Sequence, residues 1–331
     1  MNILVTGACG FIGSHLVEEL VRQNHNVTAF VFYNSRNSNG WLDCLDKKIL
    51  KNLEVVSGDI RDDEIIFQNT KKKEIIFHLA ALIGIPYSYR AVKSYIDTNI
   101  VGTYNVLNSA KKNSVSKTII TSTSEVYGTA QTIPIKENHP LNAQSPYAAS
   151  KIGADQMAMS FYRSYNLPVS ILRPFNTFGP RQSARAIIPT IISQLLNGKT
   201  SIKLGNLFPT RDFTYVEDTV AAFASTIKKN NIYGEVINIG NKFEISIQDM
   251  LEIMKKDFGF KFKVILDKNR TRDKKTEVDR LFSSNEKAKT LLNWHPKYEG
   301  KNGFIKGLGE TISWFEKDNN LKYYNSDIFN I

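Results

Sequence analysis

Short apolar runs recur through the first half of the chain, and helix-like or irregular segments separate them. The first run covers residues 2–6, and at 14–23 it is followed by apolar residues at helical spacing. Further runs lie at 27–32, 53–57, 75–79, 118–121 and 169–172. This alternation predicts an α/β fold in which helices cover both faces of a parallel sheet.

The pattern changes after Pro174. Loops, a helix near 189–196, short strands and scattered arginine and lysine residues replace the regular alternation. We therefore expect a doubly wound, Rossmann-type parallel sheet at 1–174 and a smaller C-terminal substrate-binding lobe at 175–331. The 331 residues suit one two-lobed enzyme as well as two separate domains.

A glycine motif follows the first apolar run. Gly7, Gly10 and Gly13 are spaced G-x-x-G-x-x-G between the predicted strand and the predicted helix. In this context the first glycine permits a tight turn, the second lets the backbone approach a pyrophosphate, and the third allows close helix packing. Amides at the start of the helix hold phosphates. The motif therefore predicts a dinucleotide site.

Two further segments carry acid–base chemistry. Tyr147 and Lys151 lie four residues apart, so on a helix they share one face. An ammonium beside a phenol favours the phenolate, and we expect it to lower the Tyr147 pKa towards neutrality. Glu125 supplies a second base, which simple alcohol oxidation does not need. Two bases in one site indicate oxidation followed by elimination.

Together these residues resemble the extended short-chain dehydrogenase/reductase superfamily, in particular its nucleotide-sugar epimerases and 4,6-dehydratases. The resemblance runs from Gly7 to about Trp294. Its motifs occur in the expected order at 58–60, 78–81, Asn99, 122–128, 147–151, 173–181 and 211–216. Residues 181–186, Arg270, Arg272 and 276–278 are similar to the N-acetylglucosamine 4,6-dehydratases of legionaminic acid pathways.

The resemblance implies conversion of an NDP-N-acetylglucosamine, GDP-linked in preference to UDP-linked, to the 4-keto-6-deoxy sugar. C4 is oxidised, water is eliminated across C5 and C6, and the hydride returns to C6. The catalytic residues implied are Thr123, Ser124, Glu125, Tyr147 and Lys151.

Each catalytic residue has an expected role. Tyr147 takes the C4 hydroxyl proton, and Lys151 holds the phenolate and the nicotinamide ribose. Thr123 binds the C4 oxygen, and Glu125 removes the C5 proton. Ser124 positions the C6 hydroxyl or a water, since serine is a poor acid. A helix-start carboxylate, favoured by the helix dipole, is the alternative for Glu125.

The resemblance extends the dinucleotide site beyond the glycines. The expected contacts are Gly7, Gly10, Phe11, Ile12, Gly13, Arg36, Asp59, Ile60, Leu79, Ala80, Ala81, Asn99, Thr121, Tyr147 and Lys151. Asn99 either holds the loop beside the nicotinamide or caps local backbone. An NAD-specific site usually carries an acid after the second strand, but residues 30–36 contain none. The cofactor is NAD or NADP. Arg36 suits a 2′-phosphate and favours NADP, whereas a neutral pocket in that segment would accept NAD.

The C-terminal lobe is expected to bind the nucleotide sugar. The candidate residues are Asn176, Arg185, Arg211, Arg272 and Glu277. Arg211 and Arg272 suit bidentate recognition of phosphate oxygens, with a surface salt bridge as the alternative for each arginine. Glu277 would accept hydrogen bonds from the ribose or the base. Asn176 would contact the diphosphate or the sugar.

Two expectations about assembly also follow from the resemblance. Residues 215–240 return to the first lobe. Helices near 94–111 and 147–165 pair with their symmetry mates in a homodimer, with ordinary packing against the sheet as the alternative.

The composition of the chain limits which partners, metals and cell compartments are to be expected. The net charge of +11 admits nucleic acid as a partner, but the lysines are scattered and form no basic stripe with aromatic residues. We expect a solvated surface charge and no nucleic-acid partner. Two cysteines give no disulfide framework, and no His/Cys cluster indicates a metal. The first run begins at residue 2 and no apolar stretch is long enough to span a membrane. We therefore expect a cytoplasmic enzyme without a membrane partner.

Three alternatives stay open. A UDP-glucuronate decarboxylase carries similar motifs and also oxidises C4, but it releases carbon dioxide. A 4-epimerase has no use for Glu125. A catalytically silent dinucleotide-binding regulator can dispense with Tyr147 and Lys151, whose joint presence argues against it.

Overall fold

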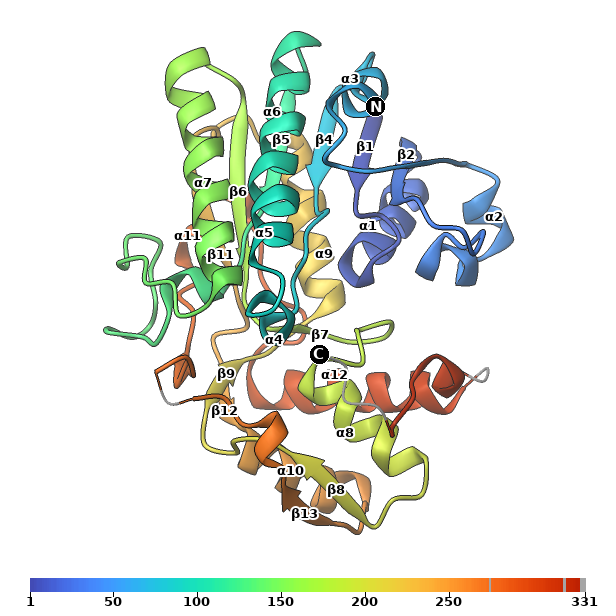
Figure 1. The fold of residues 1–331 in the computed structure, drawn as a ribbon, viewed down its shortest axis with the longest axis vertical. Helices are drawn as coiled ribbons and strands as arrows, with labels where there is room; N and C mark the ends of the chain where they lie inside the picture. The colour runs from blue at the N-terminus through green and yellow to red at the C-terminus, as the bar shows by residue number, and fades with distance from the viewer. Residues whose placement is uncertain (274, 318–319, 328–331) are drawn as a thin grey trace.

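The computed structural model describes residues 1–273, 275–317 and 320–327 (Figure 1). Its centre is a seven-stranded parallel sheet of order β11-β6-β5-β4-β1-β2-β3. The strands are β1 (Asn2–Thr6), β2 (Asn26–Phe32), β3 (Leu53–Gly58), β4 (Ile75–His78), β5 (Lys117–Thr121), β6 (Val169–Pro174) and β11 (Val236–Ile239). The strand order reverses between β1 and β4, which opens a ligand crevice at their carboxyl ends. The predicted α/β class with a Rossmann-type sheet is confirmed.

Helices cover both faces of this sheet. On one face pack α3 (Asp63–Thr70), α6 (Gly102–Lys112) and α7 (Pro146–Tyr165), and on the other α1 (Phe11–Arg22), α9 (Val216–Ser225) and α11 (Glu286–Leu292). Alternate residues of a strand serve the two faces, because successive side chains point to opposite sides. Ile3 and Val5 join one buried core and Leu4 joins the other.

The second lobe lies below the sheet in Figure 1. Its helices are α8 (Ile187–Leu196), α10 (Ile247–Phe258) and α12 (Gly300–Glu316). Three small sheets accompany them: β8 (Ser201–Leu204) with β13 (Lys263–Leu266), β9 (Thr210–Asp212) between β12 (Glu244–Ser246) and β14 (Arg280–Leu281), and β7 (Thr177–Phe178) with β10 (Thr214–Tyr215). The chain passes back to the large sheet through α9, which packs on α1, and β11, which pairs with β6.

Short helices and turns complete the described chain. They are α2 (Lys47–Leu50), α4 (Ile85–Ser88), α5 (Val92–Tyr95), η1 (Gly40–Cys44), η2 (Ile96–Val101), η3 (Ser124–Tyr127), η4 (Thr226–Lys228), η5 (Lys268–Arg270) and η6 (Asn320–Tyr323). α5, the π-helical turn η2 and α6 follow one another without a break. Within the described ranges, every helix is too short or too polar to cross a membrane.

The expected helix limits differ from the structure by a few residues, because caps decide them. α7 begins at Pro146, one residue before the predicted start, since Ser145 caps the helix and proline suits its first position. α8 begins at Ile187 rather than at Pro189, which occupies the first turn, where no backbone donor is needed.

Candidate active site

The glycine loop between β1 and α1 is packed so closely against the backbone that two of its three glycines have no room for a side chain. Gly7 has a φ of +69°, and a Cβ atom there would lie 2.7 Å from the Ala80 nitrogen. A Cβ on Gly13 would lie 2.2 Å from the Gly7 oxygen. A Cβ on Gly10 would meet only that oxygen, at 3.2 Å, and the space around it is otherwise open. The loop can therefore accept a close approach at Gly10, where the first amides of α1 have no partner within the helix.

A second backbone segment, 79–82, is fixed beside the glycine loop. Leu79 N donates to the Thr6 carbonyl, and Ala80 N donates to Thr6 Oγ1 at 3.2 Å. Asn99 Oδ1 accepts from Leu82 N and its Nδ2 donates to the Leu82 carbonyl, both at 2.9 Å. Asn99 thus holds this segment, which includes Ala81, and the predicted place of the segment beside a nicotinamide stays a prediction.

The ribose end of the predicted cofactor site carries a different set of groups. Asp59 forms an ion pair with Arg61 at 2.5 Å, and the buried Ile60 side chain packs where a Cβ on Gly102 would lie. The Arg36 side chain is exposed. Its backbone nitrogen donates to Asn34 Oδ1 at 3.0 Å.

The turn η3 and the helix α7 carry the predicted catalytic residues. Thr123 caps η3, and its Oγ1 accepts from Glu125 N at 3.2 Å. Ser124 is buried and Glu125 is half-buried. On α7, Tyr147 is 7% and Lys151 4% exposed. The Thr123 side chain is hydrogen-bonded to Tyr147, so turn and helix meet at these residues.

One part of the sequence prediction is wrong. Burial raises the pKa of the Tyr147 phenol above its usual value, and the hydrogen bond with Thr123 lowers it only in part. The negative charge of Glu125 raises this pKa further. Lys151 does not lower it towards neutrality. The Lys151 ammonium is instead directed at the Thr121 carbonyl, to which Nζ donates at 2.6 Å. Burial lowers the pKa of Lys151 itself, and the Asp155 carboxylate partly offsets that effect.

Glu125 connects the catalytic turn to the second lobe. Its carboxylate acts on the pKa of Arg211, which burial lowers and which Glu125 and Glu277 raise. Arg211 is 8% exposed, and its Nη2 lies 3.5 Å from Glu277 Oε1. Arg272 Nη1 lies 3.7 Å from the same oxygen. Two guanidinium groups therefore share one carboxylate near Glu125, and Glu277 is paired with arginine in this structure.

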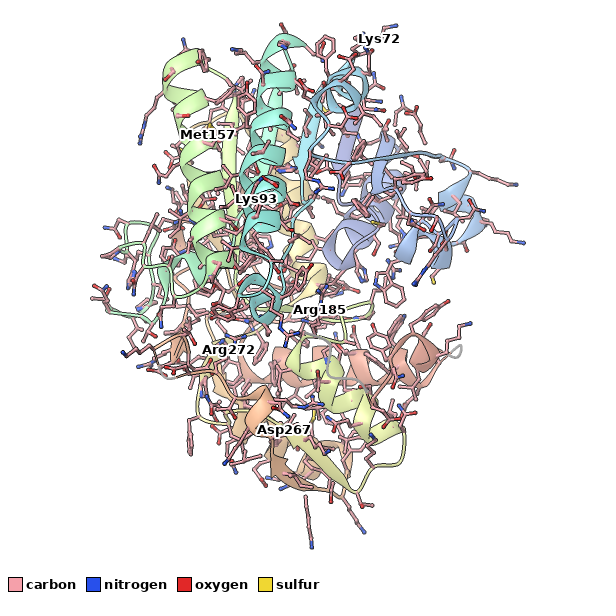
Figure 2. The ribbon with its side chains drawn as sticks, in the orientation of Figure 1. Lys72, Lys93, Met157, Arg185, Asp267 and Arg272 are labelled. Atoms are coloured by element: carbon pink, nitrogen blue, oxygen red, sulfur yellow. The ribbon has the colours of Figure 1, made fainter. Side chains whose placement is uncertain are left out.

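The two other predicted substrate residues lie apart from this cluster. Arg185 is exposed, and its guanidinium lies 3.2 Å from where a Cβ on Gly84 would be, so it reaches the loop of the first lobe (Figure 2). Asn176 Oδ1 is buried without a hydrogen-bond partner among the residues described, and so is Thr121 Oγ1. Such buried acceptors are costly unless a ligand or water completes them.

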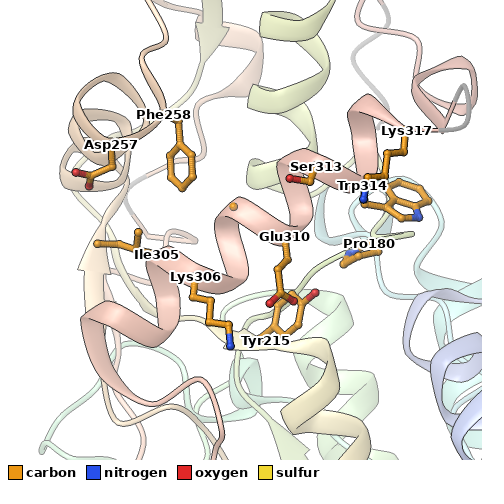
Figure 3. Close-up of a pocket in the computed structure, with 11 residues that line it drawn as sticks. Pro180, Tyr215, Asp257, Phe258, Ile305, Lys306, Glu310, Ser313, Trp314 and Lys317 are labelled. Atoms are coloured by element: carbon orange, nitrogen blue, oxygen red, sulfur yellow. The ribbon is translucent and has the colours of Figure 1, made fainter.

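One cavity opens on the second lobe, and another lies where the two lobes meet. One, of about 670 Å³, is lined by residues that include Tyr215, Phe258, Glu310 and Trp314 (Figure 3). It contains no residue of the predicted site. The other, of about 540 Å³, is lined by Thr129, Asn142, Ala143, Gln144, Lys275, Glu277 and Asp279, and so it borders the arginine cluster.

Comparison with known proteins identifies the family. A profile of the family described as GDP-mannose 4,6 dehydratase matches residues 4–306. The chain belongs to this family. The predicted membership of the extended short-chain dehydrogenase/reductase superfamily is thereby confirmed, whereas the finer resemblance to N-acetylglucosamine 4,6-dehydratases stays a prediction.

Relatives of this dehydratase-family chain carry several names. Human dTDP-D-glucose 4,6-dehydratase is 32% identical over 334 residues, 96% of this chain and 90% of the relative. A Methanocaldococcus jannaschii protein provisionally named UDP-glucose 4-epimerase is 32% identical over 322 residues, 96% and 99% of the two chains. A UDP-N-acetyl-alpha-D-glucosaminuronate decarboxylase of Bacillus cytotoxicus is 32% identical over 336 residues, 96% and 98%.

A solved structure of another nucleotide-sugar dehydratase is also similar to this chain. DesIV, a dTDP-glucose 4,6-dehydratase of Streptomyces venezuelae with NAD and TYD bound, aligns with a TM-score of 0.84. It is 28% identical, and the alignment covers 98% of this chain and 99% of DesIV. The open cradle at Gly10 and the unpaired Thr121 Oγ1 in this family member fit a dinucleotide.

Two residues beside the site were not singled out from the sequence. Tyr95 is buried, its hydroxyl donates to the Gly84 carbonyl at 2.5 Å, and its ring stands edge-on to Tyr147 with centroids 6.3 Å apart. Gln144 Nε2 donates to the Glu277 carbonyl at 2.8 Å. Neither residue lies in a motif, so no spacing or charge pattern in the sequence identifies it.

Proposed function

We propose that this protein is a nucleotide-sugar 4,6-dehydratase with an NAD(P)-binding half at 1–174 and 215–240 and a substrate lobe in the rest of 175–331. The observation that carries the proposal is the presence of two potential bases in one site. The Glu125 carboxylate is close enough to Tyr147 to raise the pKa of the phenol. Relatives named 4,6-dehydratases support the reaction type.

The residues of the chain divide the work. Gly10, Phe11 and Ile12 would hold the pyrophosphate through backbone amides at the start of α1. When bound, the dinucleotide would supply hydride transfer, a chemistry that side chains lack. Glu125 would remove the C5 proton, which a C4 ketone makes acidic.

Tyr147 needs help to act as a base. Because burial raises its pKa, the phenolate that takes the C4 proton has to be stabilised by its neighbours. The hydrogen bond from Thr123 provides part of this stabilisation. Lys151, on the same helix, would hold the nicotinamide ribose. The buried Ser124, between Thr123 and Glu125 in the sequence, would position the C6 hydroxyl.

We propose N-acetylglucosamine as the sugar and GDP, in preference to UDP, as its carrier. The support for this finer assignment is the similarity at 181–186, Arg272 and 276–278. Arg211 and Arg272 would bind the diphosphate, with Arg185, Asn176 and Glu277 around the sugar and nucleoside. For the cofactor, the exposed Arg36 supports NADP, while the NAD in DesIV supports NAD.

One experiment tests the reaction. The purified protein is incubated with GDP-, UDP- and dTDP-linked hexoses and with UDP-glucuronate, and the products are analysed by mass spectrometry. We expect loss of one water, largest with GDP-N-acetylglucosamine. Loss of carbon dioxide from UDP-glucuronate would instead favour the decarboxylase, which one relative's name makes the second candidate. An unchanged mass with an inverted C4 would favour an epimerase.

We also propose a homodimer that pairs α5–α6 and α7 with their symmetry mates. Ile96, Val101 and Tyr104 support it, because these large apolar side chains are 42%, 39% and 43% exposed along one helix. Sedimentation of the wild type and of a Val101→Glu variant tests this arrangement. If the wild type and the Val101→Glu variant sediment with the same mass, the proposed dimer interface is wrong.

A further inference from the structure

A buried ion pair lies beneath the catalytic turn. Asp155, on α7, and Arg173, on β6, are 1% and 3% exposed. Asp155 Oδ2 accepts from Arg173 Nη2 at 2.9 Å and from Arg173 Nε at 3.2 Å. The same oxygen accepts from Ser122 Oγ at 2.7 Å. Ser122 immediately precedes Thr123, so the pair holds the start of the turn.

Arg173 holds the other end of the turn. Its Nη1 donates to the Tyr127 hydroxyl at 2.8 Å, and its guanidinium lies 4.9 Å from the centre of the Tyr127 ring. The Tyr127 hydroxyl in turn donates to Asn238 Oδ1 at 2.8 Å. Tyr127 is fully buried and lies two residues after Glu125.

The ion pair therefore connects two segments that the chemistry needs together. Ser122 precedes the turn that carries Glu125, and Tyr127 ends it. Asp155 lies one helical turn beyond Lys151 on the helix of Tyr147. Two buried charges cost desolvation that apolar side chains of similar volume would avoid. The pair is thus a poor choice for stability alone, but its directional hydrogen bonds fix the turn against the helix.

We infer that Asp155 and Arg173 are positioning residues that hold the Glu125 carboxylate and the Tyr147 phenol in the relative placement needed for two-base chemistry. This inference rests on the proposed function. Asp155 and Arg173 act through Ser122 and Tyr127 and do not touch the sugar. A displacement of about 1 Å at a reacting group can slow a reaction about 100-fold.

Two conservative variants test the inference. Ser122→Ala and Tyr127→Phe each remove one hydroxyl from the network and keep the apolar volume. We expect kcat to fall about 10-fold or more and KM to stay near the wild-type value, because substrate contacts are unchanged while alignment is lost. Exchange of the C5 hydrogen in heavy water should slow in parallel, since it reports on Glu125.

Matched variants separate positioning from general loss of packing. Ser170→Ala removes a buried hydroxyl on β6 that donates to the Ile232 carbonyl, and Tyr324→Phe removes one that donates to the Gln182 carbonyl. Both should keep kcat. Wild-type kcat in Ser122→Ala and Tyr127→Phe, with turnover present in the unmodified protein, would overturn the inference and leave the proposed function intact.

A second readout does not depend on turnover. Urea unfolding of Ser122→Ala, Tyr127→Phe and the double variant forms a double-mutant cycle. Because both hydroxyls bond to the same ion pair, we expect their effects on unfolding to be non-additive. Additive effects would overturn the inference even if no nucleotide sugar proved to be a substrate.

Discussion

The two halves of the candidate site are built in different ways. On the sheet, the backbone shapes the site: Gly7 and Gly13 leave no room for a Cβ, and Asn99 holds a loop through two hydrogen bonds with the Leu82 backbone. In the second lobe, charged side chains shape it: Arg211 and Arg272 converge on Glu277. A site built by backbone geometry fixes the class of chemistry, whereas a site built by long side chains is suited to selecting one substrate.

The largest expected effect concerns the sheet half. Tyr147→Phe should lower kcat about 100- to 10,000-fold, because it removes the group that in our proposal exchanges a proton with the C4 hydroxyl. Cofactor content, measured after denaturation of the purified protein, should stay at the wild-type level. A variant that keeps near-normal turnover would show that Tyr147 is a packing residue.

The second lobe should respond through substrate binding instead. Arg211→Gln should raise KM about 10- to 100-fold with a much smaller change in kcat, since a charge-assisted hydrogen bond contributes about 1.5–3 kcal/mol. Arg280→Gln is the matched control, because Arg280 pairs with Glu244 near the surface on the neighbouring strand. Equal KM values for the two variants would contradict a substrate contact by Arg211.

The stability of the sheet half should depend on a neutral histidine. His78 is 2% exposed, its ring nitrogens lie 2.8 Å from Thr6 Oγ1 and 3.0 Å from Thr103 Oγ1, and burial lowers its pKa to about 3. The unfolded histidine binds a proton below about pH 6.5, and the folded one does so only near pH 3. This contribution to stability is therefore present at neutral pH and is lost as the pH falls.

Urea unfolding at pH 7 and pH 5 measures the effect. We expect His78 to account for a loss of about 2 kcal/mol between these values, which His78→Gln should abolish. The exposed His295, replaced by Gln, is the control and should leave the pH dependence unchanged. An identical pH dependence in all three proteins would mean that His78 can be protonated in the folded state.

The smallest effect is expected where a side chain on the sheet half selects the cofactor. Arg36→Ala should weaken NADP about 10-fold and leave NAD nearly unchanged, because only NADP presents a 2′-phosphate to the guanidinium. Fluorescence titration of both dinucleotides gives the ratio. Equal weakening of both would remove Arg36 from the account of cofactor choice.

The sheet half could be predicted closely from the sequence. Glycine spacing, short apolar runs and the residues that follow each run are local signals, and the strands lie within one or two residues of the predicted limits. The ion pair between Asp155 and Arg173 could not be predicted from the order of the strands. The two residues are 18 positions apart in the sequence, and only the fold brings them together.

The second lobe was less predictable for the same reason. Arg211 and Glu277 are 66 residues apart, and no periodic pattern indicates that they share an ion pair. The sequence also misled at Tyr147. Spacing places Lys151 on the same helix face, but it does not show that Thr121 accepts the ammonium or that burial raises the phenol pKa.

The central claim is that Glu125 is the second base, and hydrogen exchange at C5 tests it most directly. Wild type and Glu125→Gln are incubated with the nucleotide sugar in heavy water, and deuterium at C5 is measured by mass spectrometry and NMR. The account predicts deuterium at C5 with the wild type and almost none with Glu125→Gln, which should still oxidise C4. If Glu125→Gln incorporates deuterium and forms the 4-keto-6-deoxy product near the wild-type rate, Glu125 is structural and the two-base account is wrong.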